Sequence, residues 1–369
     1  MKRQILLTIG ALGLLLGLCG CGNEAAQSTA ASEEPAQETF GALAEPEVQT
    51  PAPVEEVTAE PSTLEDSAMP EESAVETAAP EPDAAELLES SWDEPAVSEM
   101  YAAVADQFEQ REYTDAETGL TIPYNLYVPQ TEGTEVYPMV VFIADSTSVG
   151  QDLSAPLAQG YGGIIWATET EQEKHKSYVL VPEYPEIIID DNHGETVTDY
   201  VEATARMIQA VAEENAVDTD RIYGTGQSMG CMTMLYLAAN HPELFAAELF
   251  VSGQWQVEEL PQLDSQTFFY IAAGGDMKAS QGQADVLADL ETKGIPVSTS
   301  YEWDANWTDA EYAAVLRPML EEGNAIHIGQ FAAGTVLEAK PGRGIEHMAS
   351  FDCAYRIDGV RNWLFAQHK

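Results

Sequence analysis

The chain has 369 residues, of which 45% are hydrophobic, and its formal net charge is −48 at pH 7. This length accommodates one large domain or two small ones. So negative a charge argues against nucleic acid as a partner, because binding to phosphates needs Lys and Arg side chains. It also argues against electrostatic docking to anionic lipids.

The first residues predict a secretory signal. Met1-Lys2-Arg3 is a short basic region, and the apolar stretch 5–18 is too short to be a convincing membrane-spanning helix. Leu18-Cys19-Gly20-Cys21 resembles a bacterial lipobox, in which the cysteine after a small residue is lipidated and becomes the new N-terminus. We therefore expect residues 1–20 to be a lipoprotein signal peptide and Cys21 to anchor an extracytoplasmic protein to the bacterial cell membrane. An ordinary signal peptide and an uncleaved anchor are the alternatives.

The segment after Cys21 has the composition of a disordered chain. From Gly22 to about Val97 it consists mainly of Ala, Glu, Pro, Ser and Thr and contains no Lys or Arg. Such a segment cannot bury enough apolar surface to offset the entropy lost when it becomes ordered. We predict a disordered acidic tether over residues 21–97 and one globular domain over residues 98–369.

Strand and helix signals alternate through this domain. The first two predicted strands, 109–114 and 120–128, are joined by a turn, and the apolar runs at 139–143 and 178–182 are typical of strands buried on both faces. This alternation predicts an α/β fold with a mostly parallel sheet, helices on both faces and an antiparallel N-terminal edge. Further strands are expected at 221–224, 247–253, 267–273, 296–303 and 325–331, and helices at 196–214, 229–240, 281–292, 309–322 and 359–367.

The stretch 226–230 has the pattern G-x-S-x-G between a predicted strand and a predicted helix. In that context the pattern predicts a nucleophile elbow, a sharp turn that exposes the hydroxyl of Ser228 above a sheet. Gly226 and Gly230 supply the small residues that a strained turn needs. The start of the following helix offers free backbone N–H groups to an oxyanion. An incidental glycine turn is the alternative interpretation.

A nucleophilic serine needs a base and an acid that orients the base. In the hydrolase topology that carries this elbow, the order along the chain is Ser, then Asp or Glu, then His. His347 lies in a glycine-rich loop before the last helix, and Asp276 follows a buried strand and two glycines, at the carboxyl edge of the sheet. An ordinary loop histidine and a helix-capping aspartate are the alternative interpretations. Less favoured candidates are His327 and His368 for the base and Asp264 and Asp304 for the acid.

These residues belong to a wider resemblance. The domain from about Gln107 to Gln367 resembles α/β-hydrolases of the group that contains predicted secreted peptidases, polyhydroxybutyrate-depolymerase-like esterases and feruloyl-esterase-like enzymes. It is more distantly similar to prolyl oligopeptidase catalytic domains. The resemblance implies Ser228 as nucleophile, Asp276 as acid and His347 as base. It is carried by the segments YPMVVFIADS, SYVLVPEY, DRIYGTGQSMGCM with HPELFAAELFVSG, FFYIAAGGD, and GIEHMASFD with WLFAQ.

Two positions depart from the pattern of this group. Ala144-Asp145 stands where a His-Gly pair would normally follow the strand, and Cys231 replaces a second glycine after the elbow. An ionised Asp145 that pointed into the site would oppose a developing oxyanion. We therefore expect backbone N–H groups to form the oxyanion hole, namely that of Met229 and a second one at Asp145 or Ser146.

Other features indicate neither a metal nor a cofactor. No glycine-rich phosphate loop or dinucleotide fingerprint is found, and the stretch 190–194 is interpreted as a polar rim loop rather than a cation site. Trp255 is the best aromatic candidate for a substrate cleft. Cys231 and Cys353 are the cysteines of the domain. If the catalytic segments converge, a disulfide between them is geometrically feasible, but two buried thiols are the expected outcome.

The sequence thus predicts a lipid-anchored extracytoplasmic serine hydrolase that acts on a small-molecule or polymeric carboxylic ester through an acyl-enzyme. One alternative is a serine peptidase that acts on short peptides. The other is a non-catalytic binding lipoprotein that has kept the hydrolase fold, and Ala144-Asp145 is the best argument for it.

Overall fold

The computed structural model describes residues 83–90, 94–130, 133, 135–192 and 194–369. The predicted signal peptide, Cys21 and most of the predicted tether lie outside the described residues. The chain divides into two units, Met1–Val75 and Glu76–Lys369, and every described residue belongs to the second.

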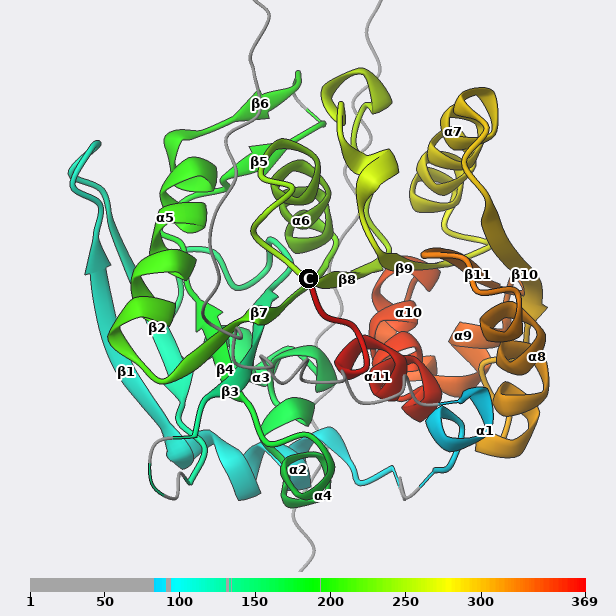
Figure 1. Ribbon diagram of the computed structural model, residues 1–369, viewed down its shortest axis with the longest axis horizontal. Helices are drawn as coiled ribbons and strands as arrows, with labels where there is room; N and C mark the ends of the chain where they lie inside the picture. Colours follow the sequence, from blue (N-terminus) through cyan, green and yellow to red (C-terminus); the bar gives the residue numbers. More distant parts are fainter. Residues whose placement is uncertain (1–82, 91–93, 131–132, 134, 193) are drawn as a thin grey trace, which may run out of the picture. The chain divides into compact units, whose positions relative to one another are not determined.

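A nine-stranded sheet runs through this domain (Figure 1). Strand β2 pairs antiparallel with both β1 and β4, and every other pair of neighbours is parallel. This confirms the predicted fold class, including the antiparallel N-terminal edge. In spatial order the strands are β1 (Phe108–Thr114), β2 (Thr121–Tyr127), β4 (Tyr178–Pro182), β3 (Tyr137–Ile143), β7 (Val217–Gln227), β8 (Ala247–Val251), β9 (Phe268–Ala273), β11 (Ile326–Phe331) and β10 (Val297–Trp303).

Helices cover both faces of the sheet, and a hydrophobic core lies under each layer. One core is covered by α5 (Asp199–Glu214), α6 (Met229–Asn240) and α7 (Met277–Lys293). The other is covered mainly by α2 (Val97–Val104), α3 (Ala155–Ala158), α8 (Asp309–Glu321), α9 (Thr335–Ala339), α10 (Glu346–Tyr355) and α11 (Asp358–Phe365). The remaining elements are α1 (Ala84–Leu87), α4 (Glu169–Lys174) and a small separate hairpin of β5 (Ile189–Asp190) and β6 (Thr196–Val197).

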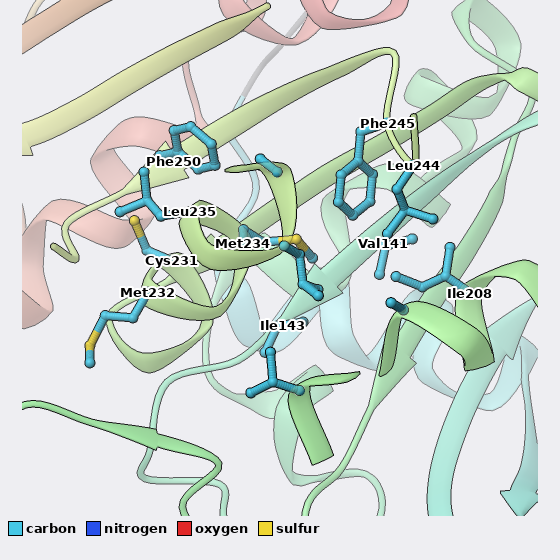
Figure 2. Close-up of a cluster of buried hydrophobic side chains, with 14 of the residues drawn as sticks. Val141, Ile143, Ile208, Cys231, Met232, Met234, Leu235, Leu244, Phe245 and Phe250 are labelled. Carbon is cyan, nitrogen blue, oxygen red and sulfur yellow. The ribbon is translucent and has the colours of Figure 1, made fainter. Parts of the chain in front are cut away.

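Helix α6 is the most deeply buried support of the elbow. Ten of its twelve residues are buried, which is typical of a helix packed on all sides rather than one with a solvent face. Figure 2 shows its side chains Cys231, Met234 and Leu235 among those of neighbouring elements. These neighbours are Val141 and Ile143 of β3, Ile208 of α5 and Phe250 of β8. The helix that follows Ser228 is therefore fixed by packing on several elements.

The domain begins before residue 98, where the sequence predicted its boundary. Leu87 and Leu88 pack against the second core, and the Asn362 side chain donates a hydrogen bond to the carbonyl of Leu87 at 2.9 Å. The carboxylate of Glu94 forms ion pairs with Lys340 (2.9 Å) and Arg356 (3.1 Å). The predicted boundary is wrong because the acidic, proline-containing composition of this stretch is that of a disordered chain. The composition does not reveal that two leucines and a carboxylate within it contact the domain.

Candidate active site

Ser228 lies between the end of β7 and the start of α6, with φ 54° and ψ −116°. A non-glycine residue in such a conformation stores about 1–3 kcal/mol of strain, which the surrounding packing must hold in place. The flanking glycines make the turn sterically feasible. A Cβ on Gly230 would lie 1.9 Å from the carbonyl oxygen of Ile143, and one on Gly226 would lie 2.4 Å from the backbone of Gly230. The local geometry is therefore that of a nucleophile elbow.

Three side chains from distant parts of the chain meet at the carboxyl edge of the sheet. His347 Nε2 lies 2.9 Å from Ser228 Oγ, and His347 Nδ1 lies 2.6 Å from Asp276 Oδ2. The side chain of Asp276 is 7% exposed and that of His347 is 28% exposed. The structure thus places the imidazole between the serine hydroxyl, whose proton it can accept, and the carboxylate that orients it.

Asp276 follows β9 and forms the N-cap of α7. Its Oδ1 accepts a hydrogen bond from the backbone N–H of Ala279 at 3.3 Å, while Oδ2 faces His347. The capping interaction and the contact with His347 therefore occur together, one on each oxygen. Because the cap fixes the rotamer, the carboxylate is held in one orientation towards the imidazole.

The glycine-rich surroundings of His347 predict a loop, but His347 does not lie in one. It is the second residue of α10, which begins at Glu346. Two buried serines join this helix to the segment after β8: Ser350 of α10 donates its Oγ hydrogen to the carbonyl of His347 (2.8 Å), and its Oγ lies 2.7 Å from Ser252 Oγ. Sequence reasoning missed both serines, since nothing in their local pattern distinguishes them from other buried serines.

The backbone donors expected for an oxyanion differ in availability. The N–H of Met229 lies in the first turn of α6, where a helix provides no internal acceptor. The N–H of Asp145 donates to Gln159 Oε1 at 3.1 Å. The N–H of Ser146 has no hydrogen-bond partner among the residues that the structure describes. Of the two predicted candidates for the second donor, Ser146 is therefore the available one.

The carboxylate of Asp145 is engaged in the loop that follows β3. Its Oδ1 accepts from the backbone N–H of Thr147 (2.8 Å) and its Oδ2 accepts from Gln227 Nε2 (3.0 Å). Asp145 is only 2% exposed. Both oxygens therefore serve as acceptors that hold this loop against the residue before Ser228, which differs from the case of a carboxylate that points into the site.

A cavity of about 490 Å³ lies beside the start of α7 and includes Trp255. Asp191 and Lys278 both line this cavity and form an ion pair at 2.6 Å. Trp255 itself is 4% exposed, and its Nε1 donates to Glu259 at 2.7 Å. The other residues that line the cavity are Glu195, Gln254, Gln256, Met277, Gln281, Gly282 and Asp285. In the described part of the chain, no His, Cys, Asp and Glu side chains gather as a metal site would require.

The less favoured acid and base candidates lie elsewhere. His327 is buried between Phe269 and Trp363, and burial lowers its pKa to about 4. Asp264 pairs with Lys293 at 3.1 Å. Among the described residues, neither Asp304 nor His368 forms a hydrogen bond or ion pair with Ser228 or His347. Asp304 accepts from the backbone N–H of Asn306, and His368 is exposed next to the last residue.

Cys231 and Cys353 are both free and buried. Burial raises the pKa of both thiols, that of Cys353 to about 12. They are therefore neutral packing residues, as expected.

Within the described ranges, every helix is too short or too polar to cross a lipid bilayer.

Residues 182–273 match the prolyl oligopeptidase family. This segment runs from the end of β4 to the end of β9 and contains Ser228, but it ends before Asp276 and His347. A comparison with curated proteins finds no match. The solved structures that resemble the chain include a thermostable esterase with 23% sequence identity and a TM-score of 0.54, aligned over 72% of this chain and 64% of that chain. The chain thus aligns with less than two thirds of that esterase.

Two further solved structures are similar at lower scores. The feruloyl esterase module from Clostridium thermocellum has 11% identity and a TM-score of 0.45, over 69% of this chain and 87% of that chain. The acylaminoacyl peptidase from Pyrococcus horikoshii has 14% identity and a TM-score of 0.40, over 72% and 42%. The strand order and the esterase likeness establish an α/β-hydrolase fold. The family match relates it distantly to prolyl oligopeptidase and supports a serine hydrolase.

Proposed function

We propose that this chain is a lipid-anchored extracytoplasmic serine hydrolase of carboxylic esters. The observation that carries the proposal is the continuous hydrogen-bonded path from Ser228 Oγ through His347 to Asp276, built on a strained elbow. The strained backbone of Ser228 costs free energy. Nucleophilic catalysis needs a serine with a base in hydrogen-bond reach, and His347 Nε2 lies 2.9 Å from Ser228 Oγ.

In the proposed reaction, Ser228 Oγ attacks the acyl carbon while His347 Nε2 accepts its proton. Asp276 accepts a hydrogen bond from Nδ1–H, which fixes the imidazole tautomer and stabilises the imidazolium that forms. The backbone N–H groups of Met229 and Ser146 stabilise the tetrahedral oxyanion. His347 then protonates the leaving alkoxide, and a water molecule releases the acyl group by the same route in reverse.

Labelling with a fluorophosphonate tests the nucleophile, and a panel of esters tests the substrate class. We expect Ser228→Ala to lose both labelling and ester hydrolysis without a loss of thermal stability. Ser146→Ala is the matched control, because it keeps the backbone N–H that the proposal uses and should retain activity. Equal labelling of Ser228→Ala and the unmodified protein would contradict the proposal.

A peptidase acting on short peptides is the second candidate, and the match of residues 182–273 to the prolyl oligopeptidase family favours it. An esterase and a peptidase of this kind use the same attack by Ser228 and differ in the leaving group, which is an alcohol for an ester and an amine for a peptide. Matched ester and amide substrates with the same acyl group separate them: a higher kcat/KM on esters is expected, and efficient amide cleavage would favour the peptidase. A protein that neither labels nor turns over any substrate would be the non-catalytic binding lipoprotein.

A further inference from the structure

Glu346 precedes His347 and binds two loops with one carboxylate. Its Oε2 accepts a hydrogen bond from the backbone N–H of Gly275 at 3.0 Å, and its Oε1 accepts from the N–H of Gly334 at 2.8 Å. Gly275 immediately precedes Asp276. Gly334 lies after β11 and is the N-cap of α9, with φ +91°. The carboxylate therefore joins the start of α10 to the loop that carries Asp276 and to the start of α9.

A side chain at position 275 would force the Glu346 carboxylate out of its place. A Cβ at this position would lie 2.1 Å from Glu346 Oε1 and 2.2 Å from Cδ. The φ of Gly275 is not in the left-handed region, so the backbone conformation itself does not require glycine there. The close approach of the carboxylate is thus the observed reason for a glycine before Asp276.

Two parallel links now join the same pair of segments. One is the 2.6 Å hydrogen bond between His347 and Asp276, and the other is the bond between their preceding neighbours, Glu346 and Gly275. A single hydrogen bond allows two segments to pivot about it, whereas two bonds from adjacent residues fix their relative orientation. Charged acceptors also form stronger hydrogen bonds with backbone N–H groups than neutral acceptors do.

We propose that Glu346 is a positioning residue that holds His347 and Asp276 in register, an inference that rests on the proposed function. In the described part of the chain, the Glu346 carboxylate forms no hydrogen bond with either side chain, so it acts through the backbone of Gly275. An acidic residue in the first turn also favours the helix electrostatically. That effect needs only a charge and does not require two backbone donors from separate loops.

The test compares Glu346→Ala with Glu338→Ala. Glu338 is an exposed glutamate of α9 whose side chain makes no hydrogen bond or ion pair among the described residues, so its removal controls for the loss of one nearby charge. We expect Glu346→Ala to lower kcat by about 10- to 100-fold with KM changed less than twofold, because misplacement of a catalytic group by about 1 Å can cost a hundredfold. Glu338→Ala should behave as the unmodified protein.

The kcat of Glu346→Gln should lie between that of Glu346→Ala and that of the unmodified protein. Its amide oxygen can still accept one backbone N–H, but its NH₂ group then faces the other N–H donor. The rate of fluorophosphonate labelling should fall in parallel with kcat, since both depend on activation of Ser228. All rates are expressed per active site, as counted by labelling to completion, so that a misfolded fraction does not lower them.

Gly275→Ala provides the coupling test. In the unmodified background its methyl group meets the carboxylate, and we expect a loss of kcat. The Glu346→Ala background lacks the three atoms that lie nearest to this methyl group, so the second substitution should add less than a twofold effect. Unchanged kcat in Glu346→Ala, or independent effects of the two substitutions, would overturn the inference. If Ser228→Ala retained activity in the same assays, the proposed function would fail instead.

Discussion

Asp145 has a role in the site that its charge alone does not suggest. Both carboxylate oxygens accept hydrogen bonds, from Thr147 N–H and from the Gln227 side chain. We expect Asp145→Gly to lower kcat on a simple ester by about tenfold or more, because the loop that carries the second oxyanion donor loses its anchor, and loss of one donor costs a hundredfold or more. Asp145→Asn keeps one acceptor oxygen and should lose less. A kcat above that of the unmodified protein in Asp145→Gly would restore the interpretation of an inhibitory charge.

Glu183 makes the stability of the domain depend on pH. It follows β4, is 4% exposed, and one of its carboxylate oxygens has no partner among the described residues. Burial raises its pKa from 4.5 to about 7. Because the folded state holds this proton more tightly than the unfolded state, the carboxyl of Glu183 contributes stability that is fully present below pH 4.5 and is lost as pH rises through 7.

Glu183→Gln should remove this contribution. We expect the variant to be more stable than the unmodified protein at pH 8, by up to about 3 kcal/mol, with little difference near pH 4.5. Urea denaturation at the two pH values measures the effect, and Glu186→Gln, at an exposed neighbouring position, is the control. A stability difference that did not grow with pH would show that Glu183 is ionised in the folded protein.

At the scale of elements, residues 83–90 and 94–97 pack as part of the domain. Besides the contacts of Leu87 and Glu94, the Tyr161 hydroxyl donates to the carbonyl of Pro95 at 2.9 Å. We expect a chain that starts at residue 98 to be less stable than one that starts at residue 83 by about 3–5 kcal/mol, from lost apolar burial and hydrogen bonds. Urea unfolding of the two chains measures this, and equal midpoints would mean that the segment contributes nothing.

Helix α10 shows why some elements could not be predicted. Its sequence begins directly after Gly342-Arg343-Gly344-Ile345, and those glycines predict a loop. The helix forms because Phe351, Ala354 and Tyr355 are buried in the second core, a tertiary contribution that no local pattern reveals. The nucleophile elbow was predictable for the opposite reason: Gly226, Ser228 and Gly230 define it within five residues.

At the scale of the whole molecule, the order of strands along the chain was easier to predict than the hydrogen bonds between residues that are distant in the sequence. Buried apolar runs such as those of β3 and β9 identify parallel strands directly. The carboxyl edge where Asp276 and His347 meet Ser228 follows from that topology together with the resemblance. The hydrogen bonds from Gln227 to Asp145 and from Gly275 to Glu346 were not predictable, because they join residues 82 and 71 positions apart in the sequence.

The proposed anchor concerns the molecule as a whole, since it decides where the domain acts. We expect Cys21→Ser to move the protein from the membrane fraction to the soluble fraction and to remove the mass of the acyl groups. Fractionation and intact mass spectrometry measure the two effects. Ester hydrolysis by the soluble variant should be unchanged on a water-soluble substrate. Unchanged partitioning and mass would exclude lipidation at Cys21.

The contact at Gly230 has a consequence for how far this site can be altered. A methyl group there would lie 1.9 Å from the carbonyl oxygen of Ile143 and 2.9 Å from that of Ala144. The helix that positions the nucleophile and the strand that leads to Ser146 thus touch backbone to backbone, with no side chain between them. No side chain at this contact can change in size to alter the distance between Ser228 and the N–H of Ser146. Even one added carbon at Gly230 would therefore push the start of α6 away from the end of β3 and separate the nucleophile from the oxyanion donor.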